Sequence, residues 1–256
     1  MLRFLFLMML IQIPLLAKVK TEIVEYKDGD VTLKGFLAYN TNSTEKLPAV
    51  IIVHEWWGLN EYPKMRAQQL AELGYAAFAV DMYGDGKVAS SGEEAGKLAG
   101  SIRGDIPKLR KRINVALDWL KQNPHVNPNK IAVIGYCFGG TVALELARSG
   151  ADIKGVVTFH GGLGTPNPAD TKDVKAKILV CTGGDDKFVP QTDIMAFQKE
   201  MNDAKVDWQM NVYSGAVHSF TNPKSGNNPA MGVAYNENAD KRSFEAMKQF
   251  FIEIFN

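Results

Sequence analysis

Residues 131–140 constrain the fold of this 256-residue chain more than any other stretch. The apolar run 131–134 is typical of a buried parallel strand, and 141–148 has the pattern of a helix. Between them, Gly135 and Gly139 stand two positions before and two positions after Cys137. Glycines give a strained strand-to-helix turn the space to project its central side chain. The pattern therefore predicts a nucleophile elbow of the form G-x-S-x-G, with cysteine in place of serine.

Two other interpretations of this turn are weighed against the elbow. An ordinary turn with a structural cysteine would carry the same residues, because free cysteine is among the most often buried residue types. A nucleotide-binding loop fits less well. Gly135, Gly139 and Gly140 miss the G-x-G-x-x-G spacing, and no P-loop lysine follows them.

Residues 1–17 have the character of a secretory signal peptide. Arg3 supplies a positive start, 4–11 an apolar stretch, and 14–17 a cleavage region. The segment is short for a membrane span. Leu15 is larger than the residue preferred three positions before a cut, so an uncleaved anchor or a cut elsewhere stays open. We expect a periplasmic or secreted protein, with 18–256 as a single domain.

The composition suits a globular protein with a large core, since 46% of the residues are hydrophobic and 22% charged. Arg3 is the only charged residue of 1–17, so removing this segment leaves 28 of the 29 basic residues against 28 acidic ones. Such a balanced chain lacks the basic surface that nucleic acids or anionic membranes attract.

The two cysteines raise the question of a disulfide, which is the usual state of paired cysteines in an exported protein. Cys181 lies in the apolar run 178–181, which is typical of a buried strand. The elbow would direct Cys137 away from the core. We therefore expect both thiols to be free.

Apolar runs alternate with helical patterns along the rest of the chain, which predicts a mainly parallel sheet with helices on both faces. The first segment, 19–39, instead predicts an antiparallel hairpin around its Asp-Gly-Asp turn. Further strands are predicted at 48–53, 75–80, 131–134, 154–159, 177–182 and 208–213, and helices at 62–73, after Asp105, and at 141–148, 191–203 and 238–254.

Polar side chains follow several of these strands. Because functional sites of parallel sheets lie at the carboxyl ends of the strands, we expect these residues to converge. They are His54, Glu55, Asp81, Cys137, His160, Asp186 and His218.

A thiol attacks as the thiolate, and an unperturbed cysteine, with a pKa of about 8.5, is only slightly ionised at neutral pH. Cys137 therefore needs a base. His218, after the last strand, is placed to return to the elbow, and Asp186 to fix its tautomer. Each residue taken alone could instead have a structural role, His218 as a loop histidine and Asp186 as a helix cap. The order nucleophile, acid, histidine is that of α/β-hydrolases.

These motifs together resemble the dienelactone hydrolase family, Cys-dependent members of the α/β-hydrolase fold. The resemblance covers roughly residues 20–254. The matching pieces are His54-Glu-Trp-Trp-Gly-Leu59, Asp81-Met-Tyr83, Gly135-Tyr-Cys-Phe-Gly-Gly140, Gly183-Gly-Asp-Asp-Lys-Phe-Val-Pro190 and His218-Ser-Phe220.

The resemblance implies a hydrolase of small esters or lactones that forms a thioester acyl-enzyme on Cys137. His218 would act as base and then as acid, with Asp186 as the orienting carboxylate. Glu55 would hold the thiol in the resting enzyme, against the alternative of a glutamate bound by loop amides. The sequence around Glu55 does not suit a zinc protease helix, because Gly58 stands where a second histidine is needed.

Backbone N–H groups of Trp56 and Phe138 would form the oxyanion hole. The side chains of Trp56, Trp57 and Tyr83 are expected to line the pocket, although aromatic residues at strand ends are as often core packing. His54 and His160 are expected to be structural.

Two departures from the family bear on the substrate. Two arginines hold the substrate carboxylate in the dienelactone hydrolase that this chain resembles, and the corresponding positions here are Asp85 and Asn222. We therefore expect a neutral substrate, unless loop insertions have moved the anion site. No metal or organic cofactor is implied. The alternatives are a thioesterase or other acyl hydrolase and, from another class, a thiol redox sensor or binding protein on a hydrolase scaffold.

Overall fold

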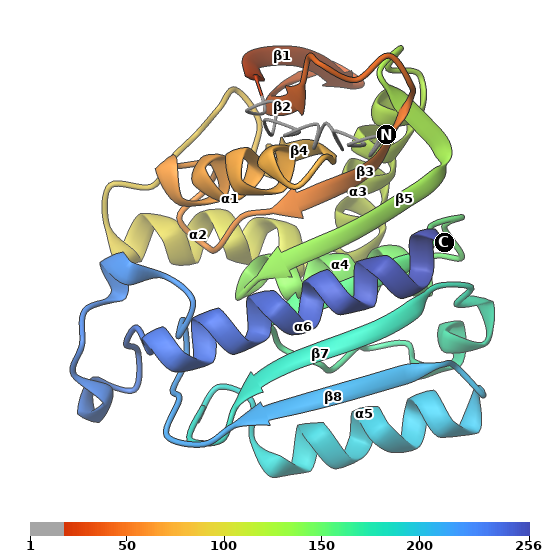
Figure 1. Cartoon of the computed structure of the whole chain (residues 1–256). Helices are drawn as coiled ribbons and strands as arrows, with labels where there is room; N and C mark the ends of the chain where they lie inside the picture. The colour runs from red at the N-terminus through yellow and green to blue at the C-terminus, as the bar shows by residue number, and fades with distance from the viewer. Residues whose placement is uncertain (1–17) are drawn as a thin grey trace, which may run out of the picture.

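One eight-stranded sheet organises the computed structural model, which describes residues 18–256 (Figure 1). The strand order is β1-β2-β4-β3-β5-β6-β7-β8. The hairpin β1–β2 is antiparallel and the neighbours from β4 to β8 are parallel, as predicted. The hairpin joins the rest of the sheet through the β2–β4 pair, which is antiparallel. The predicted signal peptide, 1–17, lies outside the described residues. The strands are β1 (Val19–Asp28), β2 (Val31–Asn40), β3 (Leu47–Val53), β4 (Ala76–Val80), β5 (Val126–Tyr136), β6 (Gly155–Phe159), β7 (Lys177–Gly183) and β8 (Trp208–Tyr213).

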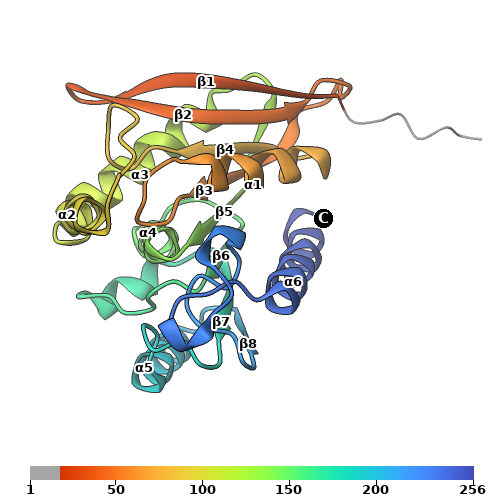
Figure 2. The same cartoon turned by 90° about the vertical axis from the view of Figure 1, so that its left-hand side faces the viewer.

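Helices cover both faces of the sheet (Figure 2). Helices α1 (Glu61–Glu72) and α6 (Glu237–Phe255) pack on one face. The other face carries α3 (Ile106–Lys121), α4 (Phe138–Arg148) and α5 (Gln191–Asp203), and α2 (Gly92–Arg103) packs against α3. Short 3₁₀ helices lie in the connections: η1 (Pro168–Asp173), η2 (Pro223–Ser225) and η3 (Pro229–Met231).

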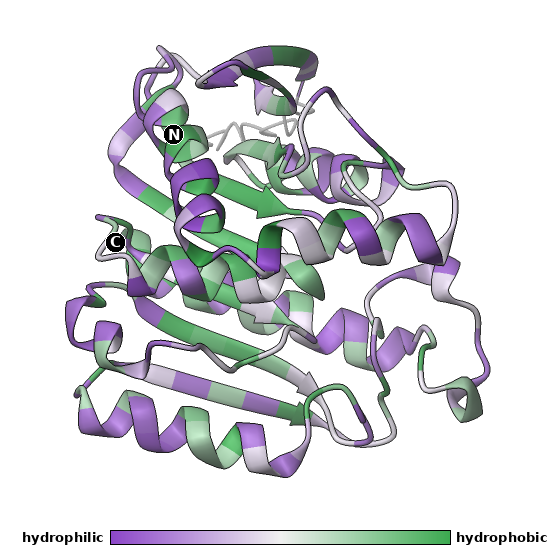
Figure 3. Cartoon of the chain, turned by 180° about the vertical axis from the view of Figure 1, so that it is seen from behind, coloured by the Kyte–Doolittle hydropathy of each residue, from purple (hydrophilic) through white to green (hydrophobic). Residues whose placement is uncertain are grey.

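The central strands are apolar on both sides because both of their faces are covered. In β3, Ile51 and Val53 belong to the core under α3 and α4, and Val50 and Ile52 to the core under α1 and α6. All four side chains are fully buried. Figure 3 shows hydrophobic strands behind helices that are hydrophilic on their outer sides.

The first part of β5 corrects the sequence prediction. The strand begins at Val126, five residues before the predicted start at Ile131, because Val126 pairs with Leu47 before a shift in register. The polar, proline-containing segment 127–130 has no strand pattern of its own.

Helix α4 begins at Phe138, directly after the elbow cysteine, three residues earlier than the periodicity indicated. The helix predicted after Asp105 is α3, and Asp105 caps it, since its side chain accepts from the Lys108 N–H.

Candidate active site

Cys137 lies at the bend between β5 and α4, with a φ of 53° and a ψ of −115°. This backbone conformation is strained for a non-glycine residue. The glycines two residues before and two residues after Cys137 are required because a side chain at either position would clash with backbone atoms. A Cβ on Gly135 would lie 1.9 Å from the carbonyl oxygen of Gly139, and one on Gly139 would lie 2.3 Å from that of Val53. The predicted elbow geometry is therefore confirmed, and it leaves the thiol half-buried beside the pocket.

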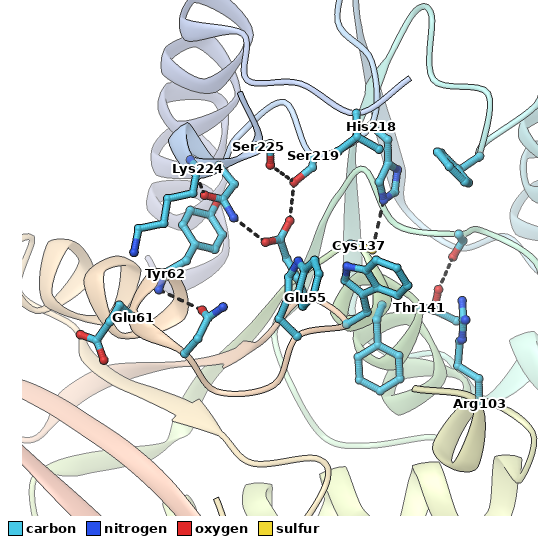
Figure 4. A pocket seen from close by; sticks show the side chains of 18 residues that line it. Glu55, Glu61, Tyr62, Arg103, Cys137, Thr141, His218, Ser219, Lys224 and Ser225 are labelled. Atoms are coloured by element: carbon cyan, nitrogen blue, oxygen red, sulfur yellow. Dashed lines mark hydrogen bonds between the residues drawn. The ribbon is translucent and has the colours of Figure 1, made fainter. Parts of the chain in front are cut away.

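The structure brings Cys137, His218 and Asp186 into one hydrogen-bonded line (Figure 4 shows the Cys137–His218 contact). His218 Nε2 lies 3.1 Å from the Cys137 sulfur, and His218 Nδ1 lies 2.9 Å from Asp186 Oδ2. The other oxygen of Asp186 accepts the Phe188 N–H at 2.8 Å. These residues follow β5, β8 and β7, so the parallel strands deliver them to one edge of the sheet.

The raised pKa of His218 favours its protonated form, which suits a thiol partner. Burial lowers the pKa of His218, but hydrogen bonds to Asp186 and Cys137 outweigh burial and raise it to about 10. A protonated imidazole donates from both nitrogens, which matches the acceptors on its two sides. A positive neighbour of this kind favours the reactive thiolate form of a cysteine.

The expected contact of Glu55 with the thiol is wrong for this structure. The Glu55 carboxylate accepts hydrogen bonds from the Ser219 hydroxyl and, at 2.6 Å, from the Asn222 amide, whereas the thiol is bonded to His218. The side chain is 4% exposed. Burial raises the pKa of the Glu55 carboxyl, against the lowering effect of these two hydrogen bonds. Glu55 therefore ties the end of β3 to the residue next to His218.

Neither position of the family's anion clamp carries a cation into the pocket. Asn222 lines the pocket but donates to Glu55. Asp85 is exposed, lies outside the pocket lining and pairs with Lys87 at 3.4 Å. Asp85 therefore does not face the pocket and has no direct contact with a substrate bound at Cys137.

Of the expected pocket aromatics, Trp56 and Trp57 line the cavity and Tyr83 does not. Tyr83 is buried and donates its hydroxyl to the Trp56 carbonyl oxygen at 2.8 Å. It supports the loop from behind because its ring packs on His54 and Phe138.

The cavity beside Cys137 has a volume of about 650 Å³. Figure 4 shows Arg103 and Lys224 on opposite sides of Cys137. Sequence reasoning missed Arg103, because it lies at the end of α2, away from the motifs. Lys224, two residues after Asn222, was expected in a solvated loop, but it lies in η2 and lines the pocket. The lining residues are Glu55, Trp56, Trp57, Asn60, Glu61, Tyr62, Arg103, Cys137, Phe138, Thr141, Gly162, Phe188, His218, Ser219, Asn222, Lys224, Ser225 and Val233.

His54 has the structural role predicted for it. It is fully buried, its Nδ1 contacts the Glu55 carbonyl oxygen, and its Nε2 accepts the Met82 N–H at 3.3 Å. Burial lowers its pKa, so the ring is neutral. Both cysteines are free, as expected, and Cys181 is fully buried.

Within residues 18–256, no group of three or more His, Cys, Asp or Glu side chains is arranged to hold a metal ion. In the same residues, no helix is both long and apolar enough to span a membrane.

Comparison with known proteins identifies the family of the chain. The model of the dienelactone hydrolase family matches residues 33–255. The chain is 32% identical to the protein usf of Aquifex pyrophilus in an alignment of 211 residues that covers 79% of this chain and 88% of that protein. It superposes on the solved structure m3DLH with a TM-score of 0.90 and 39% identity, covering 93% of this chain and 99% of the other.

A second solved structure, the dienelactone hydrolase-like promiscuous phosphotriesterase P91 from metagenomic libraries, is 38% identical. Its TM-score is 0.87, over 93% of this chain and 99% of the other. The family match covers most of the chain, including every strand from β3 to β8. The chain therefore has the α/β-hydrolase fold, belongs to the dienelactone hydrolase family and is a hydrolase that acts on carboxylic esters or lactones.

Proposed function

We propose that the chain cleaves a small ester or lactone with Cys137 as nucleophile, His218 as base and then acid, and Asp186 as the carboxylate that orients His218. The observation that carries this proposal is the unbroken contact from the thiol through both imidazole nitrogens to the carboxylate. Such a line is what an activated nucleophile requires.

In the acylation step, the thiolate of Cys137 attacks the substrate carbonyl carbon and its π electrons move to the oxygen. Trp56 and Phe138 both line the pocket, and their backbone N–H groups would receive this oxyanion. The C–O bond then breaks, and the leaving alkoxide takes the proton from His218. In the second step His218 removes a proton from water, the hydroxide attacks the thioester, and the thiolate leaves.

We further propose that Glu55 tunes the thiol indirectly, through Ser219 and the loop that carries His218. We also propose that residues 18–256 act as one hydrolase domain. Residues 1–17 would then direct export to the periplasm or the exterior.

The test is Cys137→Ala against the matched control Cys181→Ala. Cys137 faces the pocket and packs little core, so the first variant should fold, as circular dichroism would show, and lose ester turnover. The control should keep its activity, because Cys181 is buried away from the pocket. If Cys137→Ala keeps more than a few per cent of the activity, the proposed nucleophile is wrong.

Two other substrates belong in the same assay. A thioesterase would use the same residues, and turnover of acyl thioesters above aryl esters and neutral lactones would favour it. A neutral phosphotriester is the second, because the similar protein P91 is described as a promiscuous phosphotriesterase and the clamp positions here hold no cation. A redox sensor on this scaffold would instead show reversible thiol oxidation and no turnover.

A further inference from the structure

His160 lies directly behind the nucleophile, at the end of β6. Its side chain is fully buried, and its backbone has a φ of 42°, which is uncommon for a non-glycine residue. Its Nδ1 accepts the backbone N–H of Cys137 at 3.1 Å, and that N–H also points to the Phe159 carbonyl oxygen at 3.0 Å. The elbow cysteine is therefore held by an imidazole that the proposed chemistry does not use.

The contacts of His160 fix its tautomer. Because Nδ1 accepts the Cys137 N–H, the ring proton is on Nε2, which donates to Thr221 Oγ1 at 2.8 Å. Burial, and the charge of the nearby His218, hold the pKa of His160 well below its ordinary value. The ring centroids of His160 and His218 are 5.2 Å apart, so a neutral His160 adds no repulsion when His218 is protonated.

The line of hydrogen bonds continues from Thr221 into the fold. Thr221 Oγ1 also accepts the Tyr62 hydroxyl at 2.6 Å. Arg66 donates from Nε to the Tyr62 oxygen at 3.3 Å and from a terminal nitrogen to the Thr221 carbonyl oxygen at 2.8 Å. Arg66 is itself buried in an ion pair with Asp240, so the line joins α1 and α6 to the elbow.

We propose that His160 is a positioning residue. It holds the peptide before Cys137 in place, and the hydrogen bonds of Thr221, Tyr62 and Arg66 in turn hold the His160 ring in place. The proposal rests on the proposed function, since it concerns the same thiol. A tilt of this peptide would displace the Cα of Cys137 and, with it, both the sulfur and the Phe138 N–H. Holding the peptide through its N–H therefore aligns the nucleophile and half of the expected oxyanion hole together.

A buried, polarised line of hydrogen bonds is suited to this task because each member is buried and is hydrogen-bonded to the next. A misplacement of about 1 Å at reacting atoms can cost about 10²-fold in rate. Removing the acceptor for Cys137 should therefore lower kcat more than it changes KM, because substrate contacts elsewhere in the pocket stay in place.

Three variants test the proposal. His160→Leu removes both hydrogen bonds and should lower kcat by about 10²-fold. His160→Asn keeps an acceptor near the Nδ1 position and suits the positive φ, so it should recover most of this loss. Thr221→Val removes the acceptor of both the His160 Nε2–H and the Tyr62 hydroxyl but leaves the bond between His160 and the Cys137 N–H in place. The loss of these two buried hydrogen bonds predicts a fall in kcat of about tenfold or more. His125→Asn, at an exposed histidine away from the pocket, is the matched control.

Iodoacetamide labelling of Cys137 as a function of pH provides a readout that does not depend on turnover, and the buried Cys181 adds no background. The proposal predicts altered labelling in His160→Leu and Thr221→Val and a profile close to that of the unmodified protein in His160→Asn. Equal losses in the Leu and Asn variants would mean that His160 only fills space. If His160→Leu fails to fold, an unchanged kcat and labelling profile in Thr221→Val would overturn the proposal. Failure of the proposed function would appear separately, as activity in Cys137→Ala.

Discussion

Replacing Asp186 with asparagine should disable the base without changing the shape of the site. The side chain is fully buried, and its two oxygens have different partners, the Phe188 N–H and His218 Nδ1. In Asp186→Asn, the amide oxygen keeps the Phe188 N–H, which turns the amino group toward His218. An amino group only donates. His218 Nδ1 must then give up its hydrogen and accept, so the ring carries its proton on Nε2, facing the thiol.

The expected loss follows from this change of tautomer. A neutral imidazole protonated at Nε2 is unable to take the proton of Cys137 or of water through that atom. General-base help contributes about 10²–10⁴-fold, and an incorrect tautomer in a serine triad costs about 10⁴-fold. We therefore expect kcat/KM to fall by about 10³–10⁴-fold, which is about 4–5 kcal/mol of transition-state stabilisation.

The assay is kcat/KM for a neutral aryl ester at neutral pH, with circular dichroism to check the fold. Asp185→Asn is the matched control, because Asp185 is the adjacent, exposed carboxylate. It should retain the original rate. A folded Asp186→Asn variant within about tenfold of the original rate would refute the reasoning, since general-base catalysis through this histidine supplies more than that.

Three further results are expected. Glu55→Gln should change the pH profile of iodoacetamide labelling, because it weakens the bonds to Ser219 beside His218, and an unchanged profile would leave Glu55 a structural role only. A neutral lactone should have a higher kcat/KM than its carboxylated analogue. In the presence of salt, Arg103→Gln should change the ratio of these two kcat/KM values little, because exposed cations are screened. A salt-sensitive preference for the carboxylated analogue that Arg103→Gln removes would contradict this prediction. The pKa of His218 is about 10 in the folded protein against an ordinary 6.5, so protonation of His218 stabilises the fold. This contribution is fully present below pH 6.5 and is lost as the pH rises through 10. Urea unfolding at pH 6 and 10 should therefore show a smaller loss in His218→Gln than in the unmodified protein, and equal losses would place the titration elsewhere.

The sequence predicted the features that depend on neighbouring residues. The elbow needs glycines at fixed spacing around Cys137, because backbone atoms occupy the places of their side chains. The hairpin depends on the turn at Gly29, whose φ is 61°. The alignment of Cys137, Asp186 and His218 followed from strand order, because parallel strands end at one edge.

The features that escaped prediction depend on residues far apart in the chain. The partners of Glu55 are 164 and 167 residues away, and no local pattern marks them. The bond from His160 to the Cys137 N–H spans 23 residues and appears only once β5 and β6 are paired. Tyr83 was expected in the pocket because it follows a strand, but its hydroxyl finds a backbone acceptor at Trp56 instead.

Asn222 connects the substrate question to the nucleophile. Its amide nitrogen donates to Glu55 at 2.6 Å, and its amide oxygen accepts the Lys224 N–H at 3.0 Å. A carboxylate taken into a closed pocket needs paired, charge-assisted donors to offset lost hydration of several kcal/mol. An asparagine already engaged at both ends offers no such pair, whereas the planar fork of an arginine has donors to spare. Asn222 therefore fills one position of the family's anion clamp without a cation and also supplies the bond that holds Glu55 in the loop beside His218, which is why we expect a neutral acyl group to be the preferred substrate.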